Sequence, residues 1–198
     1  MSIDTLVSRS DFAGAFKAVK PHVIPKTERF LDVLRNVEIR FFEDHLTMTA
    51  TNRYTLAEAR VNYLGENRLP SETGETAILV NVDDLAYAVK RPNVVSQLSV
   101  QVKENALVLD YTTEAPLDTD SSFPKLSHLW PAEGTEVEVS SISIDPKYLA
   151  MFDSRNLARS KSETSHVGLK LTFRGQSKPV ALSFSDHFRG LVMPVRTS

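Results

Sequence analysis

Cysteine is absent from the 198 residues of this chain, which excludes a disulfide framework, a thiolate metal site and a cysteine nucleophile. No stretch of about 18 apolar residues occurs, so the sequence contains no candidate for a membrane-spanning helix. The N-terminal segment MSIDTLVSRSDF has no basic region followed by a long apolar run, so it does not read as a secretory signal. These absences together predict a cytoplasmic protein that does not contact a membrane.

Residue patterns typical of catalysis are also missing. The seven glycines are scattered singly, so there is no glycine-rich phosphate loop, and no Gly-x-Ser-x-Gly motif occurs. No histidine lies four residues from another, so a metal site would need long-range convergence. The adjacent pair Asp83 and Asp84 fits a helix cap better than acid–base chemistry. The sequence therefore predicts neither an enzyme nor a cofactor.

The composition is that of an ordinary globular protein. Hydrophobic residues make up 41% and charged residues 24%, which is enough apolar material for a core in one large domain or two small ones. The chain has 23 basic and 25 acidic residues, a formal net charge of −2. Any surface that attracts a polyanion must therefore be local, with acidic surface elsewhere.

A coarse pattern of strand, short amphipathic helix and alternating strands occurs three times. The helices begin near Asp11, Asp83 and Asp145, and Pro21, Pro92 and Pro146 mark helix boundaries. The expected strands span 33–39, 45–50, 56–61, 78–80, 98–102, 106–109, 142–144, 167–173, 180–184 and 191–193. Segments 65–76 and 113–122 are expected to be loops, and 132–140 a connector. A β-α-β-β-β unit of this kind must pair with neighbours to bury its sheet and helix; the alternative is an ordinary α+β domain with coincidental similarity.

Basic residues recur on the three expected helices or just after them. They are Lys17, Lys20, Lys90, Arg91, Arg155, Arg159 and Lys161. One interpretation is a solvated helix face whose cations complement the helix dipole. The other is that equivalent helices present cations to the phosphates of one polyanion, independently of its sequence.

The C-terminal segment is apolar and is broken by Pro194. It is either a buried edge strand that ends at the proline or one wall of an apolar groove.

Three segments resemble a known family. They are TATNRYTLA (49–57), FPKLSHLWP (123–131), and IDPKYL (144–149) together with MPVR (193–196). In order and spacing they are similar to segments of the bacterial replicative sliding clamp, the beta subunit of DNA polymerase III. Asn52 and Thr55 depart from the family pattern, where aspartate and arginine are usual, which puts the polar rim of the family's docking groove in doubt.

The resemblance implies an α+β protein with the DNA-clamp fold, made of three β-α-β-β-β half-modules, about one and a half clamp domains. Residues 1–137 would form a complete domain with half-modules at about 1–66 and 76–131, and 138–198 would form the third half-module. The match is to a middle domain joined to the second half of a last domain. The parts that close the family's ring are expected to be missing, so a ring of about twelve half-modules would need four chains. The third half-module is expected to expose an apolar face that favours homo-oligomers.

The resemblance also implies a groove that binds short peptides. Its expected residues are Leu34, Thr51, Arg53, Tyr54, Leu56, Pro131, Val137, Leu191, Val192, Met193, Pro194, Val195 and Arg196. An apolar pocket that contains methionine can take varied anchor side chains.

The first functional hypothesis is a sliding clamp that assembles from several chains, most simply a tetramer, around duplex DNA. A clamp loader would open it, and the groove would tether DNA polymerase and other proteins with clamp-binding motifs, in a bacterial or phage-infected cell at the nucleoid. The basic residues named above would face the DNA. The second hypothesis is a clamp mimic that binds the same peptides as a decoy or adaptor without encircling DNA. The third is an unrelated enzyme or structural domain, whose best candidate residues would be Asp83, His128 and His187.

Overall fold

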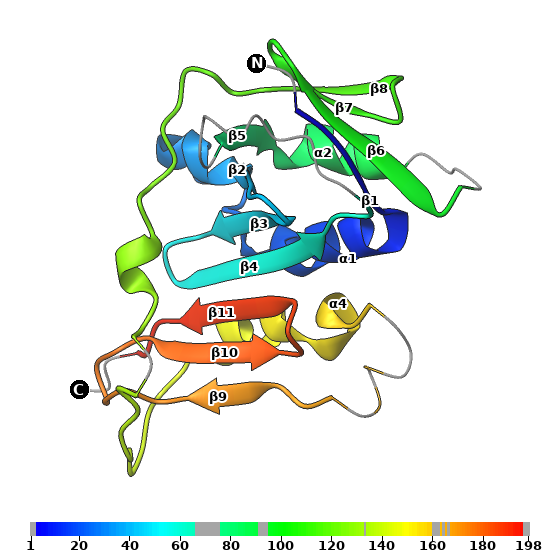
Figure 1. Cartoon of the computed structure of the whole chain (residues 1–198). Coiled ribbons are helices and arrows are strands. Elements are labelled where there is room, and N and C mark those ends of the chain that lie inside the picture. The colour runs from blue at the N-terminus through cyan, green and yellow to red at the C-terminus, as the bar shows by residue number, and fades with distance from the viewer. Residues whose placement is uncertain are drawn as a thin grey trace.

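Two antiparallel sheets and a few short helices form the protein, an α+β architecture (Figure 1). The structure is a computed structural model that describes residues 3–65, 76–90, 95–132, 134–159, 163, 165 and 167–195. The four-stranded sheet has the order β1 (Ile3–Ser8), β6 (Gln97–Lys103), β7 (Ala106–Leu109) and β8 (Thr113–Pro116). The seven-stranded sheet has the order β5 (Thr76–Asn81), β2 (Asn36–Phe41), β3 (His45–Thr51), β4 (Thr55–Asn62), β11 (Phe188–Val192), β10 (Val180–Phe184) and β9 (Lys170–Thr172).

The first two repeats, the half-modules expected at about 1–66 and 76–131, exchange their first strands; the third repeat is the half-module expected at 138–198. β1 pairs with β6 of the second repeat, with Ile3 opposite Val102, and β5 pairs with β2 of the first repeat. Alternate side chains of both sheets point to a shared core, in which Ile3, Val100 and Val37 are fully buried. Neither repeat could bury its apolar face alone, and the described residues of both contribute to one core.

Two helices pack on this core where the sequence predicts them. α1 (Arg9–Val19) buries Phe12, Phe16 and Val19, but its cap is Ser8, whose side chain accepts a hydrogen bond from the Asp11 amide. α2 (Val82–Val89) is capped by Asn81 in place of the expected Asp83. Both caps lie two or three residues before the expected ones, because each helix begins directly at the end of its preceding strand. No helix in the described part of the chain is long and apolar enough to cross a membrane.

Short 3-10 turns occupy several connections. They are η1 (Lys20–His22), η2 (Arg29–Arg35), η3 (Ser127–Leu129) and η4 (Ala150–Phe152). Pro21 stands inside η1, two residues after the end of α1, and redirects the chain there. η2 occupies the start of the strand expected at 33–39, so that β2 begins only at Asn36.

The third repeat differs from the expected pattern at its first strand. Ile142 and Ile144 are partly buried against the core but form no strand. The first strands of the other two repeats are held by each other's sheets, and among the described residues the third repeat has no such partner. α3 (Pro146–Leu149), with Asp145 as its cap and Pro146 as its first residue, follows as expected, and then η4 and α4 (Ser154–Leu157).

Other boundaries also move. The segment 113–122, expected to be a loop, contains β8. The strand expected at 167–173 is reduced to β9, and the last strand ends at Val192 rather than at Met193.

The third repeat joins the first through a continuous sheet. β11 pairs with β4, with Leu191 opposite Leu56 and Gly190 opposite Ala57, so one sheet runs through both repeats. Phe152 and Leu157 complete the same core. The apolar face expected to be exposed on the third repeat is therefore covered in large part by the first repeat.

Candidate functional site

The C-terminal segment lies between two other parts of the chain at the end of the β4–β11 seam. The amide of Met193 donates to the carbonyl oxygen of Tyr54 at 2.9 Å, and the amide of Val195 donates to that of Ser143 at 2.8 Å. A pocket of about 400 Å³ opens beside it. Its lining residues are Ser141, Ile142, Ser143, Gln176, Ser177, Met193, Pro194 and Val195.

Apolar side chains remain accessible around this pocket. Tyr54 is 47% exposed, Met193 40% and Val195 46%. The ring of Tyr54 stacks on that of Tyr148, with centroids 4.8 Å apart, and the Lys147 ammonium lies 4.6 Å from the Tyr148 centroid. The rings of Tyr54 and Tyr148 and the flexible thioether of Met193 form an accessible apolar surface. Such a surface can hold an apolar side chain of a ligand.

The turn between β3 and β4 is fixed by Asn52. Its Oδ1 accepts hydrogen bonds from the amides of Tyr54 and Thr55 and from the Thr55 hydroxyl. Arg53 has a φ of 76°, in the left-handed region. Asn52 and Thr55 are the two departures from the family pattern, and their hydrogen bonds hold the turn that contains Tyr54.

A buried histidine lies beneath this turn. His22 is fully buried, and its Nδ1 is hydrogen-bonded to the Thr55 hydroxyl at 2.9 Å. Its ring lies 4.5 Å from that of Phe152. Burial lowers the pKa of His22 to about 3, because the cation would lose its hydration. His22 is therefore neutral at physiological pH and ties the first repeat to the third.

The expected groove residues divide into two groups. Leu34, Thr51, Leu56, Leu191 and Val192 are buried. Arg53, Tyr54, Pro131, Val137, Met193, Pro194 and Val195 are exposed or half-buried, and Arg196 lies outside the described residues.

Of this set, Met193, Pro194 and Val195 line the pocket. Tyr54 lies beside it, because its carbonyl oxygen accepts from the amide of Met193. Leu34 packs instead in a separate small cluster with Ile24, Leu79 and Phe123, away from the pocket lining. Sequence reasoning missed Tyr148 and the pocket residues at 141–143 and 176–177. Tyr148 lies within the segment IDPKYL that carries the family resemblance, so that signal was available.

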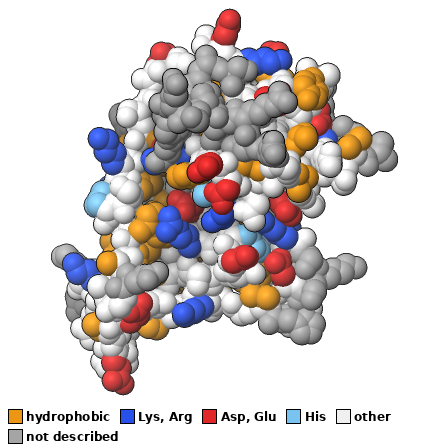
Figure 2. Space-filling model, viewed as in Figure 1, with side chains coloured by type: hydrophobic (Ala, Val, Ile, Leu, Met, Phe, Trp, Pro, Cys, Tyr) orange, Lys and Arg blue, Asp and Glu red, His pale blue; other side chains and the backbone are white. Residues whose placement is uncertain are grey.

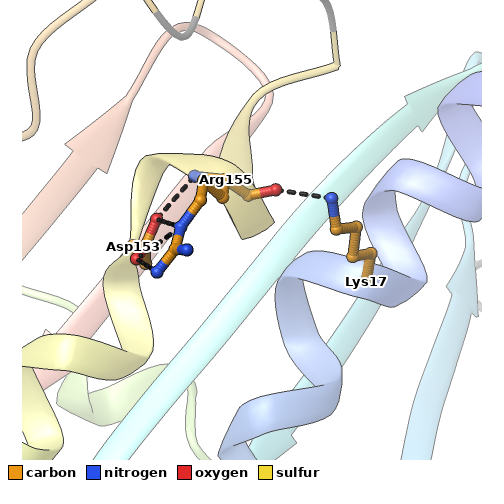
Figure 3. A network of polar contacts seen from close by, with 3 residues as sticks. All are labelled: Lys17, Asp153 and Arg155. Carbon is orange, nitrogen blue, oxygen red and sulfur yellow. Dashed lines mark hydrogen bonds and ion pairs between the residues drawn. The ribbon is translucent and has the colours of Figure 1, made fainter.

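Four of the expected DNA-facing cations are exposed on the helices: Lys17, Lys20, Lys90 and Arg155. Figure 3 shows two of them meeting between α1 and α4. The Lys17 ammonium donates to the Arg155 carbonyl oxygen at 2.5 Å, and Asp153 binds the Arg155 guanidinium at 2.6 Å. These contacts with Arg155 lower the pKa of Asp153 to about 2. Arg91 and Lys161 lie outside the described residues.

Arg159 points inward. Its guanidinium donates to the carbonyl oxygen of Arg60 on β4, and its side-chain carbons lie over Gly14 of α1, where an added Cβ would be 3.3 Å from Arg159 Cγ. Burial lowers the pKa of Arg159. Arg159 therefore connects the third repeat to the first, and its charge is not presented to solvent with the other helix cations.

The opposite face of the seven-stranded sheet carries charges of both signs. Figure 2 shows basic and acidic side chains side by side on it. Arg189 pairs with Glu58 at 2.6 Å, and its guanidinium lies 4.1 Å from the centre of the Trp130 ring. This face has no field of one sign, so it is a poor surface for a polyanion.

No protein-family model matches the chain, and no curated protein sequence matches it. Solved structures of bacterial DNA polymerase III beta subunits are similar along almost its whole length. The beta subunit of Thermotoga maritima aligns with a TM-score of 0.73 at 13% identity, over 99% of this chain. The chain has the sliding-clamp fold.

Two further clamp structures agree. The beta chain of Streptococcus pneumoniae gives a TM-score of 0.72 at 13% identity, and the sliding clamp of Bacillus subtilis 0.69 at 14%, each over 98% of this chain. The chain spans 64–65% of the length of these clamps. The predicted α+β clamp fold is thus confirmed.

Proposed function

We propose that this chain is a clamp-type processivity factor, a protein without catalysis of its own that holds partner proteins on duplex DNA. The observation that carries the proposal is the sliding-clamp fold over nearly the whole chain. The proposal includes assembly of several chains, four in a closed ring, with a clamp loader to open it.

The DNA-facing surface in this proposal is the helix side of the sheets. Lys17, Lys20, Lys90 and Arg155 are exposed there and would contact phosphates without reading bases. Arg91 and Lys161 remain predictions from the sequence alone. Arg159 is left out of this set because its guanidinium is bound to Arg60.

Salt dependence tests the DNA surface. Duplex binding by the double variant Lys17→Gln/Lys20→Gln should show a log–log salt slope smaller by nearly 2, because each lost phosphate contact removes about 0.9. Lys125→Gln/Lys178→Gln, which removes two cations away from the helices, is the matched control. Equal slopes for the helix variant and the wild type would remove these lysines from the interface.

The partner-binding surface in this proposal is the pocket beside Met193. We expect it to take a short peptide with an apolar anchor, such as the clamp-binding motif of a DNA polymerase. Tyr54→Ala/Met193→Ala should weaken binding of a labelled leucine- and phenylalanine-containing peptide by about tenfold or more. Leu149→Ala, which truncates an exposed apolar side chain outside the pocket lining, should bind normally. Unchanged binding by the double variant would reject the pocket.

One observation favours a second candidate, a clamp mimic that binds peptides without DNA. Acidic groups accompany the cations on the helices: Asp153 pairs with Arg155, and Asp83 and Asp84 stand in the first turn of α2. A mimic would bind the peptide with little dependence on salt and would show no retention on nicked circular DNA. Retention on circles and loss on linearised DNA would instead establish encirclement.

A further inference from the structure

In all three repeats, one edge of the first-strand segment is held in the same way. The carbonyl oxygen two residues before the helix cap accepts a hydrogen bond from an amide just after the last strand of the same repeat. The donors and acceptors are Leu64 and Leu6, Asp118 and Leu79, and Val195 and Ser143, and the caps are Ser8, Asn81 and Asp145. The segment around Ser143 therefore lies where a first strand belongs, although it is part of no sheet.

The other edge of this segment separates the third repeat from the first two. Successive residues of an extended chain direct their backbone groups to opposite sides, so Ile142 and Ile144 face away from Val195. In the first two repeats, the residue three positions before the cap, the place of Ile142, pairs with a strand of the other repeat. These pairs are Thr5 with Val100 and Ile78 with Ile39. Among the described residues, no strand pairs with Ile142.

The second open edge of the third repeat is β9, which ends the seven-stranded sheet (Figure 1). The carbonyl oxygen of Phe173 accepts from the amide of Val137, which is not part of the sheet. The backbone groups of Phe173 and, two residues earlier, of Leu171 therefore lie on the open side, while those of Lys170 face β10. Leu171 thus offers its amide and carbonyl to a further strand.

Leu171 has the place that Ile39 and Val100 have in the first two repeats. In each repeat, the strand after the first hairpin turn carries two buried residues, two positions apart, near its start. They are Leu46 and Met48 in β3, Leu107 and Leu109 in β7, and Val180 and Leu182 in β10. The second residue of each pair is opposite Ile39, Val100 and Leu171, respectively. Ile39 and Val100 are fully buried, whereas Leu171 is 37% exposed.

We propose that the third repeats of two copies exchange their first strands across a two-fold axis, with Ile142 of each copy opposite Leu171 of the other. Both residues direct their amide and carbonyl to an open edge, so each pair exchanges two backbone hydrogen bonds. The seven-stranded sheet of each copy gains a strand from the other copy.

The register follows from the two exchanges inside the chain and matches the faces of both segments. It places Ile144 opposite Leu169 on the inner, apolar face and Ser143 opposite Lys170 on the outer, polar face. The exchanged strand is short, because the Phe173 carbonyl at the other end of β9 is already bound within the chain.

The helix of the third repeat also lacks cover on its apolar side. Phe12 and Leu85, each four residues after its cap, are fully buried in the core that the first two repeats share. Leu149 has this place in α3 and is 37% exposed. An exchange equivalent to that of the first two repeats would bury Leu149 together with Leu171.

A second copy is the occupant that fits both edges. The occupant must offer a free first strand and an open sheet edge at the same time, and the third repeat itself carries both. The chain cannot supply this partner from the same repeat, because the first two strands of one repeat, such as β1 and β2, lie in different sheets. The contact uses the same surface on both copies, so it closes as a dimer and does not extend head to tail.

This inference goes beyond the proposed function, because the strand exchange needs neither DNA nor peptide and is tested without them. The chain has no cysteine, so introduced cysteines can react only with each other. S143C/K170C places them on the outer face at facing positions without mutual hydrogen bonds, where Cα atoms are about 4.5 Å apart and a disulfide can form. Mild oxidation should give covalent dimers, and the two disulfides leave no cysteine for larger species.

Single variants test whether the contact is reciprocal. S143C alone and K170C alone should not crosslink, and their mixture should give dimers with one disulfide. S143C/L171C, whose side chains would point to opposite faces, is the register control and should crosslink far less. A ladder of covalent trimers and tetramers from S143C/K170C would show head-to-tail pairing and would contradict the two-fold contact.

Light scattering over a concentration series tests the backbone pairing. L171P removes an amide on the open edge of β9, where proline is tolerated, so the circular dichroism should be preserved. Dimerisation should weaken about tenfold or more, because the substitution acts twice in a two-fold contact. L171V keeps the amide and an apolar side chain and should dimerise nearly as tightly as the wild type. Equal dimerisation of L171P and the wild type would reject the strand pairing, and the mixture of single variants decides independently where L171P does not fold.

The outcomes separate the interface from the function. A wild type that is monomeric at every concentration, with no S143C/K170C crosslink, would overturn the exchange whatever the DNA and peptide assays give. Dimers that form without this crosslink would also overturn it and leave assembly to other surfaces. Crosslinked dimers that bind neither DNA nor peptide would support the exchange while the proposed function falls.

Discussion

Gly190 of β11 lies against the ring of Phe152 so closely that a Cβ at position 190 would be 2.4 Å from Phe152 Cε1. The same Cβ would lie 3.0 Å from the carbonyl oxygen of Leu56 on the neighbouring strand. Phe152 is buried and stands in η4, so this contact seats the helical segment of the third repeat on the sheet. The sheet is joined to the first repeat at the same point, because Gly190 is opposite Ala57 of β4.

Gly190→Ala should therefore destabilise the protein by about 1–3 kcal/mol, the usual cost of overpacking a filled core. The measurement is urea unfolding followed by circular dichroism. Gly168→Ala is the matched control, because nothing lies within 4 Å of its added methyl group. Equal unfolding midpoints for the two variants would show that Phe152 gives way without cost.

His22 should make stability fall as the pH is lowered from 7 to 5. Its pKa is about 3 in the folded protein and 6.5 in the unfolded chain, so only the unfolded chain takes up the proton in this range. The free energy of unfolding therefore has its full value above pH 6.5. It falls by about 1.4 kcal/mol for each pH unit as the pH drops from 6.5 toward 3. Between pH 7 and 5 the wild type should thus lose about 2 kcal/mol more than His22→Gln.

Urea unfolding at the two pH values checks this expectation. His128→Gln, which removes an exposed histidine, should keep the full loss of the wild type. A His22→Gln protein that loses as much stability as the wild type would place the titrating group elsewhere.

Local patterns predicted the parts of the fold that depend on neighbours in sequence. The alternating runs that became β3, β4, β6, β7 and β10 and the apolar stripe of α1 were found because period and proline placement are local signals. The exchange of β1 and β5 and the β4–β11 pairing are not local, and no sequence pattern specifies which edge a strand joins. The strand expected at 142–144 was wrong for the same reason, since an alternating segment becomes a strand only beside a partner.

The sequence predicted some residues of the candidate site but not how they are arranged in space. Met193 and Val195 were expected from the C-terminal segment and do line the pocket. Leu34 was expected beside them but belongs to another cluster, and Arg159 was expected on the surface but lies between repeats. Burial of an arginine depends on the acceptor and the space that tertiary packing provides, here the Arg60 carbonyl and Gly14, and neither is visible in a helix pattern.

Substitution of Arg159 should lower the stability of the protein, whereas substitution of Arg155 should leave it nearly unchanged. Arg159→Ala should lower the free energy of unfolding by about 1–3 kcal/mol, because it removes a charge-assisted hydrogen bond and the packing over Gly14. Arg159→Met should lower it less, because the apolar stem remains. Arg155→Met, on the exposed cation, should stay within about 0.5 kcal/mol of the wild type.

Salt titration of duplex binding compares the same two arginines in their contribution to DNA binding. Under the proposed function, Arg155→Met should reduce the salt slope by about 0.9, and Arg159→Met should leave it unchanged. A reduced slope for Arg159→Met with unchanged stability would mean that Arg159 leaves its internal site to contact DNA.

Trp130 should report how the connector before the third repeat lies on the outer face of the sheet. It is the one tryptophan in the chain, and its ring faces the Arg189 guanidinium, which Glu58 holds in place. Arg189→Gln should weaken this contact by about 0.5–1 kcal/mol, let water reach the ring more often, shift the emission to longer wavelength and increase quenching by acrylamide. Arg155→Gln, on the helix side, should leave the spectrum unchanged. An Arg189→Gln spectrum like that of the wild type would mean that contacts elsewhere along the connector, such as the Arg174 bond to the Ala132 carbonyl, hold Trp130 in place without the cation.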